Sequence, residues 1–302
     1  MVLTAPLTTM RAKRAFLALA CVFFALCGCG APKASEPVQE PVAGAVDTVA
    51  LIRASLEANR KERDRPGELM DLIRLGKALS ASGEHKEAPD ELARAIKLAV
   101  KLQDPKGLAD AHGAMSEARL GAGDTVAALE SIEKAFEIDS KLAVVSQARL
   151  NLKGLILIRS GRPAEALVVL KSSLAIKGDR ELLSDAMRLS GVASRQTGDD
   201  AAWFFGEAYR LDRELGRTGM VALDLRELAE LNFEKGRHDE ALFLFERSYA
   251  AYLEAGAFDM ALKGLDRLID AANGLGRPEK AGYYSGLREE LLRNTSVGGA
   301  AR

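Results

Sequence analysis

The chain is poor in the residues that most often build catalytic and metal sites. Its 302 residues include only three Cys and three His. Cys21, Cys27 and Cys29 all lie within the first 29 positions, so the rest of the chain can form neither an internal disulfide nor a Cys-based metal site. With so few imidazoles, the chain also has little room for His-based catalysis or for a His-bound metal.

An excess of charge of one sign is also missing. Lys and Arg number 42, Asp and Glu number 43, and the formal net charge is −1. This balance lacks the basic footprint of a nucleic-acid-binding protein, and it argues against electrostatic adhesion to anionic lipid. The sequence contains no Gly-rich phosphate loop, no Ser or Cys nucleophile motif and no HExxH motif. It therefore predicts no nucleic-acid partner, no cofactor or metal, and no enzymatic activity.

The apolar run near the start is too short to cross a membrane. Residues 15–26 form an apolar stretch of 12 residues, whereas a transmembrane helix needs about 20. Arg11, Lys13 and Arg14 precede it, which is the arrangement of an export leader. Removal of the leader takes away three cations and no anion, so the remaining chain carries a net charge of −4.

The end of the leader, Leu26-Cys27-Gly28-Cys29, resembles the bacterial lipoprotein signal, in which a small residue precedes the lipidated Cys. Two residues before the lipidated Cys, where Ala, Ser or Thr is usual, this chain carries Cys27. The resemblance predicts cleavage between Gly28 and Cys29 and lipidation of Cys29, and two or more acyl chains would anchor the protein stably. Gly30 in place of Asp favours the outer membrane of a Gram-negative cell envelope. The alternative is an ordinary secretory signal with Cys29 incidental.

The chain divides into five segments. These are the leader (1–28), the lipidated Cys with a flexible, Pro-containing tether (29–44), an N-terminal helix (45–65), a repeated array (66–292) and a flexible tail of small and polar residues (293–302). The composition of the tether cannot build a core. The N-terminal helix is predicted because Val49, Ile52 and Leu56 share one face and Asp47 or Thr48 can cap its start.

A Gly in a short turn, followed by a helix with an Ala near its start, recurs six times at intervals of 35–40 residues. The successive pairs are Gly83 and Ala88, Gly123 and Ala128, Gly161 and Ala166, Gly198 and Ala201, Gly236 and Ala241, and Gly276 and Ala281. A fixed period of this kind indicates stacked supersecondary units. Pro89 lies just inside the second helix of unit one, so that helix must start late or bend.

Each unit reads as helix, turn, helix, with a small residue in the first helix and a large apolar one in the second. The small residues are Gly76, Ser116, Gly154, Gly191 and Ala229, and the large ones are Leu92, Ile132, Leu170, Phe205 and Phe245. This pattern resembles the tetratricopeptide repeat (TPR), in its longer variant of about 40 residues. The resemblance implies an all-α, right-handed α-solenoid of about six repeats that binds proteins. The last unit departs most from the pattern, as a solvent-capping repeat should.

In TPR proteins the first helices line a concave groove, and their non-packing positions contact peptides. The corresponding positions here are Asn151, Arg188, Arg195, Gln196, Arg226 and Glu230. Three guanidinium groups near one stretch of groove suit carboxylates, so an acidic protein segment or C-terminus is the expected ligand. The alternative is a solvated face whose Arg residues form internal ion pairs with Glu227 and Glu230.

Aromatic residues are scarce before residue 203 and concentrated after it. Trp203, Phe243 and Tyr283 stand two residues after the Ala of three successive units, where units one and two carry Asp90 and Glu130. In register, these three would form an exposed aromatic stripe, and such patches mark contacts. The alternatives are that C-terminal helices cover the stripe, or that the contracted turn of unit four directs Trp203 inward.

His85, His112 and His238 are expected to be structural, because His85 and His238 occupy the same turn position of two distant units and His112 lies on a helix. Together these observations predict a membrane-anchored lipoprotein that acts as a TPR scaffold, with envelope proteins or peptides as partners, possible homo-oligomers, and assembly of an envelope complex as its role. The alternatives are a structural lipoprotein that dimerises through the aromatic stripe, or a small-ligand carrier.

Overall fold

The computed structural model describes residues 48–84 and 86–299, with side chains as far as Thr295. The predicted leader, Cys29, the tether and His85 lie outside these residues, as do the first residues predicted for the N-terminal helix. Every regular element in the described residues is an α-helix. None of these helices is both long enough and apolar enough to cross a membrane.

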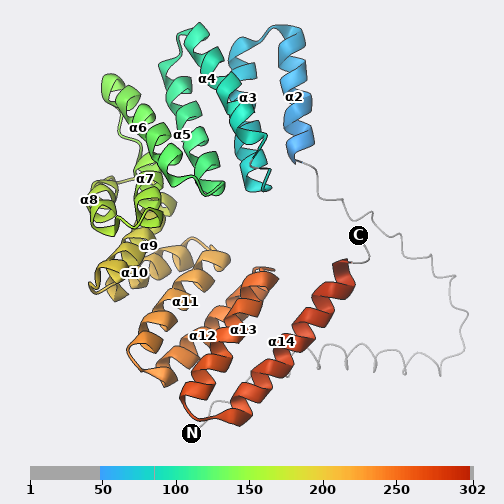
Figure 1. Ribbon diagram of the computed structural model, residues 1–302, viewed down its shortest axis with the longest axis vertical. Helices are drawn as coiled ribbons and strands as arrows, with labels where there is room; N and C mark the ends of the chain where they lie inside the picture. Colours follow the sequence, from blue (N-terminus) through green and yellow to red (C-terminus); the bar gives the residue numbers. More distant parts are fainter. Residues whose placement is uncertain (1–47, 85, 300–302) are drawn as a thin grey trace, which may run out of the picture. The chain divides into compact units, whose positions relative to one another are not determined.

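One helix precedes six helix pairs (Figure 1). Helix α2 (Thr48–Glu62) is followed by α3 (Arg65–Ala81) with α4 (Ala88–Leu102), α5 (Pro105–Gly121) with α6 (Thr125–Leu142), α7 (Gln147–Arg159) with α8 (Pro163–Leu174), α9 (Arg180–Thr197) with α10 (Ala202–Glu214), α11 (Thr218–Glu234) with α12 (His238–Glu254), and α13 (Phe258–Gly274) with α14 (Pro278–Gly299). Each helix packs on the next one along the chain, and α3, α5, α7 and α9 also pack in succession. The predicted all-α solenoid is confirmed.

The turns within the six units use glycine for its backbone freedom. The Gly of every unit has a positive φ, between +63° and +84°, a conformation that side-chain-bearing residues rarely adopt. Unit one shows how proline moves a helix start. Helix α4 begins at Ala88 itself with Pro89 in its first turn, whereas α6 begins three residues before Ala128. Pro89 is thus accommodated at the N-terminus, where its missing N–H has no helical partner to lose.

Paired helices approach closely because the first helix carries a small residue at the crossing. A Cβ atom added to Gly76 would lie 2.4 Å from Cγ of Leu92, and one added to Gly154 would lie 2.6 Å from Cδ2 of Leu170. Gly191 meets the ring of Phe205 in the same way, at 2.8 Å. The sequence pattern of small and large residues is therefore a set of direct contacts.

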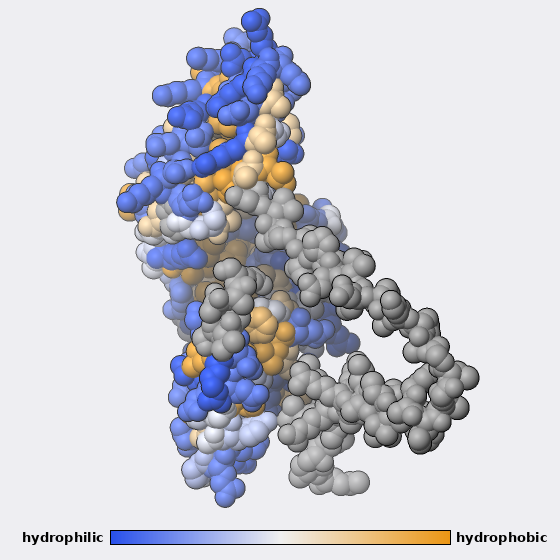
Figure 2. All heavy atoms as spheres, turned by 90° about the vertical axis from the view of Figure 1, so that its right-hand side faces the viewer, coloured by the Kyte–Doolittle hydropathy of each residue, from blue (hydrophilic) through white to orange (hydrophobic). Residues whose placement is uncertain are grey.

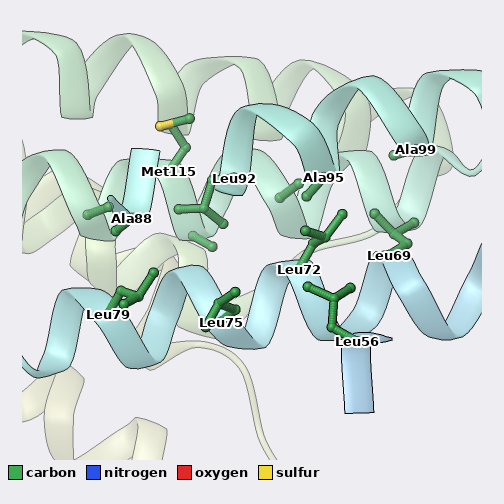
Figure 3. Packing of buried hydrophobic residues seen from close by; sticks show 13 residues of the cluster. Leu56, Leu69, Leu72, Leu75, Leu79, Ala88, Leu92, Ala95, Ala99 and Met115 are labelled. Atoms are coloured by element: carbon green, nitrogen blue, oxygen red, sulfur yellow. The ribbon is translucent and has the colours of Figure 1, made fainter. Parts of the chain in front are cut away.

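The core is a series of apolar clusters between successive helices. In the first cluster, Leu56 of α2 packs with leucines of α3 and with Leu92 and Ala95 of α4 (Figure 3). Val49 and Ile52 of α2 are half-buried against the same cluster, so α2 covers the open end of unit one. Elsewhere the surface is mostly polar: on the face seen in Figure 2, hydrophilic side chains predominate and hydrophobic ones gather in limited patches between them.

The closeness of α3 and α4 predicts the cost of a single methyl group. Gly76→Ala should lower the free energy of unfolding by about 1–3 kcal/mol, because the added Cβ overlaps the buried Leu92 side chain. Gly113→Ala is the matched control: its Cβ would meet only Arg149, at 3.7 Å, and the higher helix propensity of Ala should stabilise the chain by up to about 1 kcal/mol. Urea unfolding of both variants tests this, and equal effects would contradict it.

Candidate functional site

The structure places the aromatic stripe on the outside of the second helices. Trp203, Phe243 and Tyr283, on α10, α12 and α14, are 59%, 58% and 50% exposed. The short turn of unit four does not rotate its helix, because Phe205 is fully buried just as Phe245 is in unit five. The described residues therefore do not cover the stripe, and Trp203 does not point inward.

Side chains join the helices that carry the stripe. The guanidinium of Arg247 on α12 lies 5.6 Å from the ring centre of Phe243 and 5.7 Å from that of Tyr209 on α10, and it donates to the Tyr209 hydroxyl at 2.8 Å. On the other side, the Tyr284 hydroxyl of α14 donates to the carboxylate of Glu246. Burial, aided by this carboxylate, raises the pKa of Tyr284, so Tyr284 keeps the proton that it donates.

Sequence reasoning missed a fourth residue in this register. Val168 stands two residues after Ala166, as Trp203 does after Ala201, and it is 71% exposed on α8. The spacing from Ala166 could have identified Val168, but an aliphatic residue is a weaker sign of an interface than an aromatic one. Units three to six therefore all expose an apolar side chain at this position.

The second candidate surface is a hollow of about 430 Å³ between α9, α11 and α13. It is lined by Arg195, Arg226, Glu227, Glu230, Glu234, Lys263, Asp266 and Arg267. Three of the six predicted groove residues lie here: Arg195, Arg226 and Glu230. Gln196 is exposed beside them on α9, outside the lining.

The three arginines of this hollow already have carboxylate partners. Arg195 and Arg226 both bind Glu227, at 2.9 and 2.7 Å, and Glu230 pairs with Arg267. An acidic ligand would have to displace these contacts. The arrangement matches the alternative of an internally paired face rather than a groove of free guanidinium groups.

Asn151, predicted to line the groove, is buried instead. Its amide nitrogen donates to the Leu182 carbonyl oxygen at 2.8 Å, and its amide oxygen accepts from Ser173 Oγ at 2.5 Å. These contacts join α7 to α8 and α9, so the side chain satisfies buried polar groups between helices. Sequence mapping located the position on the helix but not the direction of its side chain.

Arg188, also predicted to line the groove, lies in a buried ion cluster at the junction of units four and five. Its guanidinium binds Asp224 of α11 at 2.7 Å, Asp185 at 3.0 Å, and Asp212 of α10. Arg217 reaches Asp212 and Asp185, each at 3.1 Å. Asp212 and Asp224 are fully buried and Arg188 nearly so. The buried ion cluster, defined by these five residues, is a structural element and not a ligand contact.

The buried ion cluster has three carboxyl groups and only two guanidinium groups, so one negative charge lacks a partner. Burial, with a smaller contribution from the neighbouring carboxyl of Asp212, raises the pKa of Asp224 to about 7 against the pull of Arg188. Oδ2 of Asp224 finds no hydrogen-bond donor among the described residues. Near neutral pH a proton on Asp224 relieves both problems at once.

A third surface was not anticipated from the sequence. Helices α3, α5 and α7 enclose a hollow of about 410 Å³, where Met70, Ile73 and Leu152 supply an apolar lining. Charged side chains at this hollow are also paired: Arg149 binds Asp110 at 2.8 Å, and Lys77 lies 3.6 Å from Glu117.

The described part of the chain offers no metal site, since it contains no group of three or more His, Cys, Asp or Glu side chains placed to hold an ion. His238 packs edge-on against Phe233, with ring centres 4.9 Å apart. His112 is half-buried on α5, and burial lowers its pKa.

Comparison with known proteins supports the fold. No family model matches the sequence, and no curated protein matches it either. Among solved structures, PilF of Pseudomonas aeruginosa has a TM-score of 0.56 and 21% identity, over 76% of this chain and 93% of that one. PilW, a type IV pilus biogenesis factor, has a TM-score of 0.57 and 21% identity, over 74% of this chain and 94% of that one. A Podospora anserina putative kinesin light chain with TPR-like repeats has a TM-score of 0.51 and 16% identity, over 63% of this chain and 96% of that one. The fold is that of a TPR solenoid.

The raised pKa of Asp224 predicts that the buried ion cluster loses stability as pH rises. The folded state holds a proton up to about pH 7, whereas the unfolded chain releases it near pH 4. The contribution of Asp224 is therefore most favourable below pH 4 and declines between pH 4 and 7. Asp224→Asn mimics the protonated form and removes this decline. The unfolding free energy of Asp224→Asn minus that of wild type should therefore increase by about 2 kcal/mol as the pH is raised from 5 to 8.

Arg188→Met is the contrasting variant. It leaves buried carboxyl groups without their cation and should destabilise the protein by about 3–5 kcal/mol at pH 8. Thermal and urea unfolding at both pH values measure the two variants. A constant difference between Asp224→Asn and wild type from pH 5 to pH 8 would contradict the assignment of the proton.

Proposed function

We propose that this chain is a lipid-anchored scaffold of the bacterial cell envelope, which acts by binding partner proteins and not by catalysis. The observation that carries the proposal is the aromatic stripe. Large apolar side chains stay exposed at the same position of consecutive units, on helices that side-chain contacts hold together. A soluble surface has no structural need for such a row, and Trp and Tyr are favoured anchors of protein interfaces.

The membrane anchor in this proposal rests on the sequence. Cleavage before Cys29 and lipidation of its thiol would leave a tether of 15 residues, 30–44, ahead of the folded unit. Extended at about 3 Å per residue, this tether would let the scaffold work up to about 45 Å from the bilayer. Gly30 after the lipidated Cys favours the periplasmic face of the outer membrane.

Assembly of an envelope complex is the role that we propose for the scaffold. PilW, a type IV pilus biogenesis factor, shares the fold, and the repeat spacing here fits the longer TPR variant of about 40 residues. We propose this role by analogy with proteins that share the solenoid architecture.

A second function, self-association through the aromatic stripe, is favoured by the same exposed side chains. Trp203, Phe243 and Tyr283 of one copy would then cover those of another. The mass of the protein in solution separates the two functions, because a scaffold with a free stripe is monomeric.

The anchor predicts different outcomes for two neighbouring cysteines. Cys29→Ala should move the protein from the membrane to the soluble fraction, because the acylated thiol is lost. Cys27→Ala is the control, since Ala is usual at that position of the signal and should leave lipidation intact. Membrane fractionation and intact-mass measurement report both. Membrane retention of the Cys29→Ala variant, without added acyl mass, would refute the anchor.

The aromatic stripe predicts which substitutions abolish partner capture. A variant with Trp203→Ala, Phe243→Ala and Tyr283→Ala should lose its cross-linked partner from native membranes. Leu51, Val100 and Val126 are comparably exposed apolar residues on α2, α4 and α6, and their triple Ala variant is the control that should keep the partner. Capture that survives in the stripe variant would shift the site to the hollow around Arg195 and Arg226.

A further inference from the structure

We propose that the aromatic stripe binds a segment of a partner protein that presents apolar side chains flanked by Lys or Arg, that is, a basic amphipathic segment. The inference rests on the proposed function and specifies the chemistry of the partner. It is carried by the hollow beside Phe243, by a repeated acidic edge along the stripe, and by the engagement of the arginines on the opposite side.

The hollow beside Phe243 combines an apolar floor with an acidic rim. Its volume is about 550 Å³, and it is lined by Phe243 and Leu244 together with Asn232, Asp239 and Glu240. A Lys or Arg side chain fits both parts, because its aliphatic stem packs on apolar surface while its charged head reaches a carboxylate. The exposed face of an aromatic ring also attracts a cation.

The acidic rim recurs along the whole stripe. Four residues before Trp203, Phe243 and Tyr283 stand Asp199, Asp239 and Glu279, all exposed. In α12 and α14 one helical turn separates the two positions, so Asp239 and Glu279 each share a helix face with the aromatic ring. Asp199 lies in the turn just before α10. Asp200 and Glu240 add two further exposed carboxylates at the same edge.

Cations near this edge do not balance it. Lys235 lies 3.8 Å from Asp200, and Arg277 binds Asp239 at 2.9 Å. Arg237 is a third cation near the edge, and Lys280 is a fourth, which lies 3.8 Å from Glu246. With Glu246 included, four cations stand against six carboxylates, which leaves a net charge of −2. In the described part of the chain, Asp199, Glu240 and Glu279 form no ion pair; they are exposed acids beside an exposed apolar row.

The arginines on the other side of the stripe are already engaged. Arg210 binds Glu207 at 3.0 Å and Glu214 at 2.8 Å, and Arg247 stacks on Phe243 while it donates to Tyr209. In a self-associated pair, the acidic edge of one copy would have to displace these contacts to pair with Arg210 or Arg247 of the other. An acidic segment would be repelled. The surface thus favours a basic partner over a second copy.

The charges contribute mainly selectivity and encounter rate. Exposed ion pairs are individually weak, so affinity comes from the apolar side chains, while the acidic edge attracts basic segments and disfavours acidic ones. Binding should weaken as salt rises, because charges at the surface are screened.

Trp203 is the only Trp in the chain, so its fluorescence reports occupancy of the stripe directly. The test titrates the full chain, in nanodiscs of zwitterionic lipid, with two synthetic amphipathic peptides that share their apolar residues. One peptide carries Lys at its remaining positions and the other carries Glu. The Lys peptide should shift Trp203 emission to shorter wavelength and bind at least tenfold more tightly than the Glu peptide.

Charge reversal locates the effect. Asp239→Lys with Glu240→Lys should abolish the preference for the Lys peptide. Glu130→Lys with Glu137→Lys, exposed acids of α6, changes the net charge equally and should leave the preference intact. Equal binding of the two peptides, preference for the Glu peptide, or no binding of either would overturn the proposal.

Two results separate this inference from the proposed function. If the Ala variant of the stripe loses its native partner but the charge-reversed variant keeps it, the scaffold function stands and the basic chemistry of the partner is wrong. If sedimentation shows a dimer that the Lys peptide does not displace, the stripe is covered by a second copy and both fail.

Discussion

The close approach of two helices at a residue with little or no side chain is the constraint on which the whole array depends. Where Gly76 meets Leu92 and Gly154 meets Leu170, no Cβ fits between the helices without a shift of the buried leucine. This contact fixes the rotation of the second helix about its axis. Because that rotation is fixed, a residue two positions after the unit's Ala points outward in every unit, and the row from Val168 to Tyr283 becomes a surface.

The junction between units four and five is held in a different way. Most units meet through leucine and alanine clusters, whereas α9, α10 and α11 meet around Arg188 and two fully buried carboxyl groups. A buried ion pair offsets a large desolvation cost and seldom stabilises more than apolar packing would. Its directional contacts instead specify one orientation of the two units, and both stripe and hollow extend across this junction.

Local patterns in the sequence predicted the helix pairs, the glycine turns and the exposure of Trp203, because each depends on residues a few positions apart. The groove was harder to predict. The fate of Arg188 depends on Asp212 and Asp224, which lie 24 and 36 residues further along the chain, and that of Asn151 depends on the Leu182 carbonyl. A repeat pattern gives the position of a side chain on its helix but not its partner on a neighbouring unit. The hollow between α3, α5 and α7 was not predicted because its lining comes from three different units.

In a solenoid each unit contacts only its neighbours, so stability is close to a sum of unit and interface contributions. Such an array unfolds cooperatively only if every interface between units is strong. Where one interface is weak, the units on one side can unfold while those on the other side stay folded. The buried ion cluster places a titratable interface between the first four units and the last two. Loss of the Asp224 proton weakens this interface, so we expect the last two units, which carry Phe243 and Tyr283, to unfold more independently of the first four as pH rises.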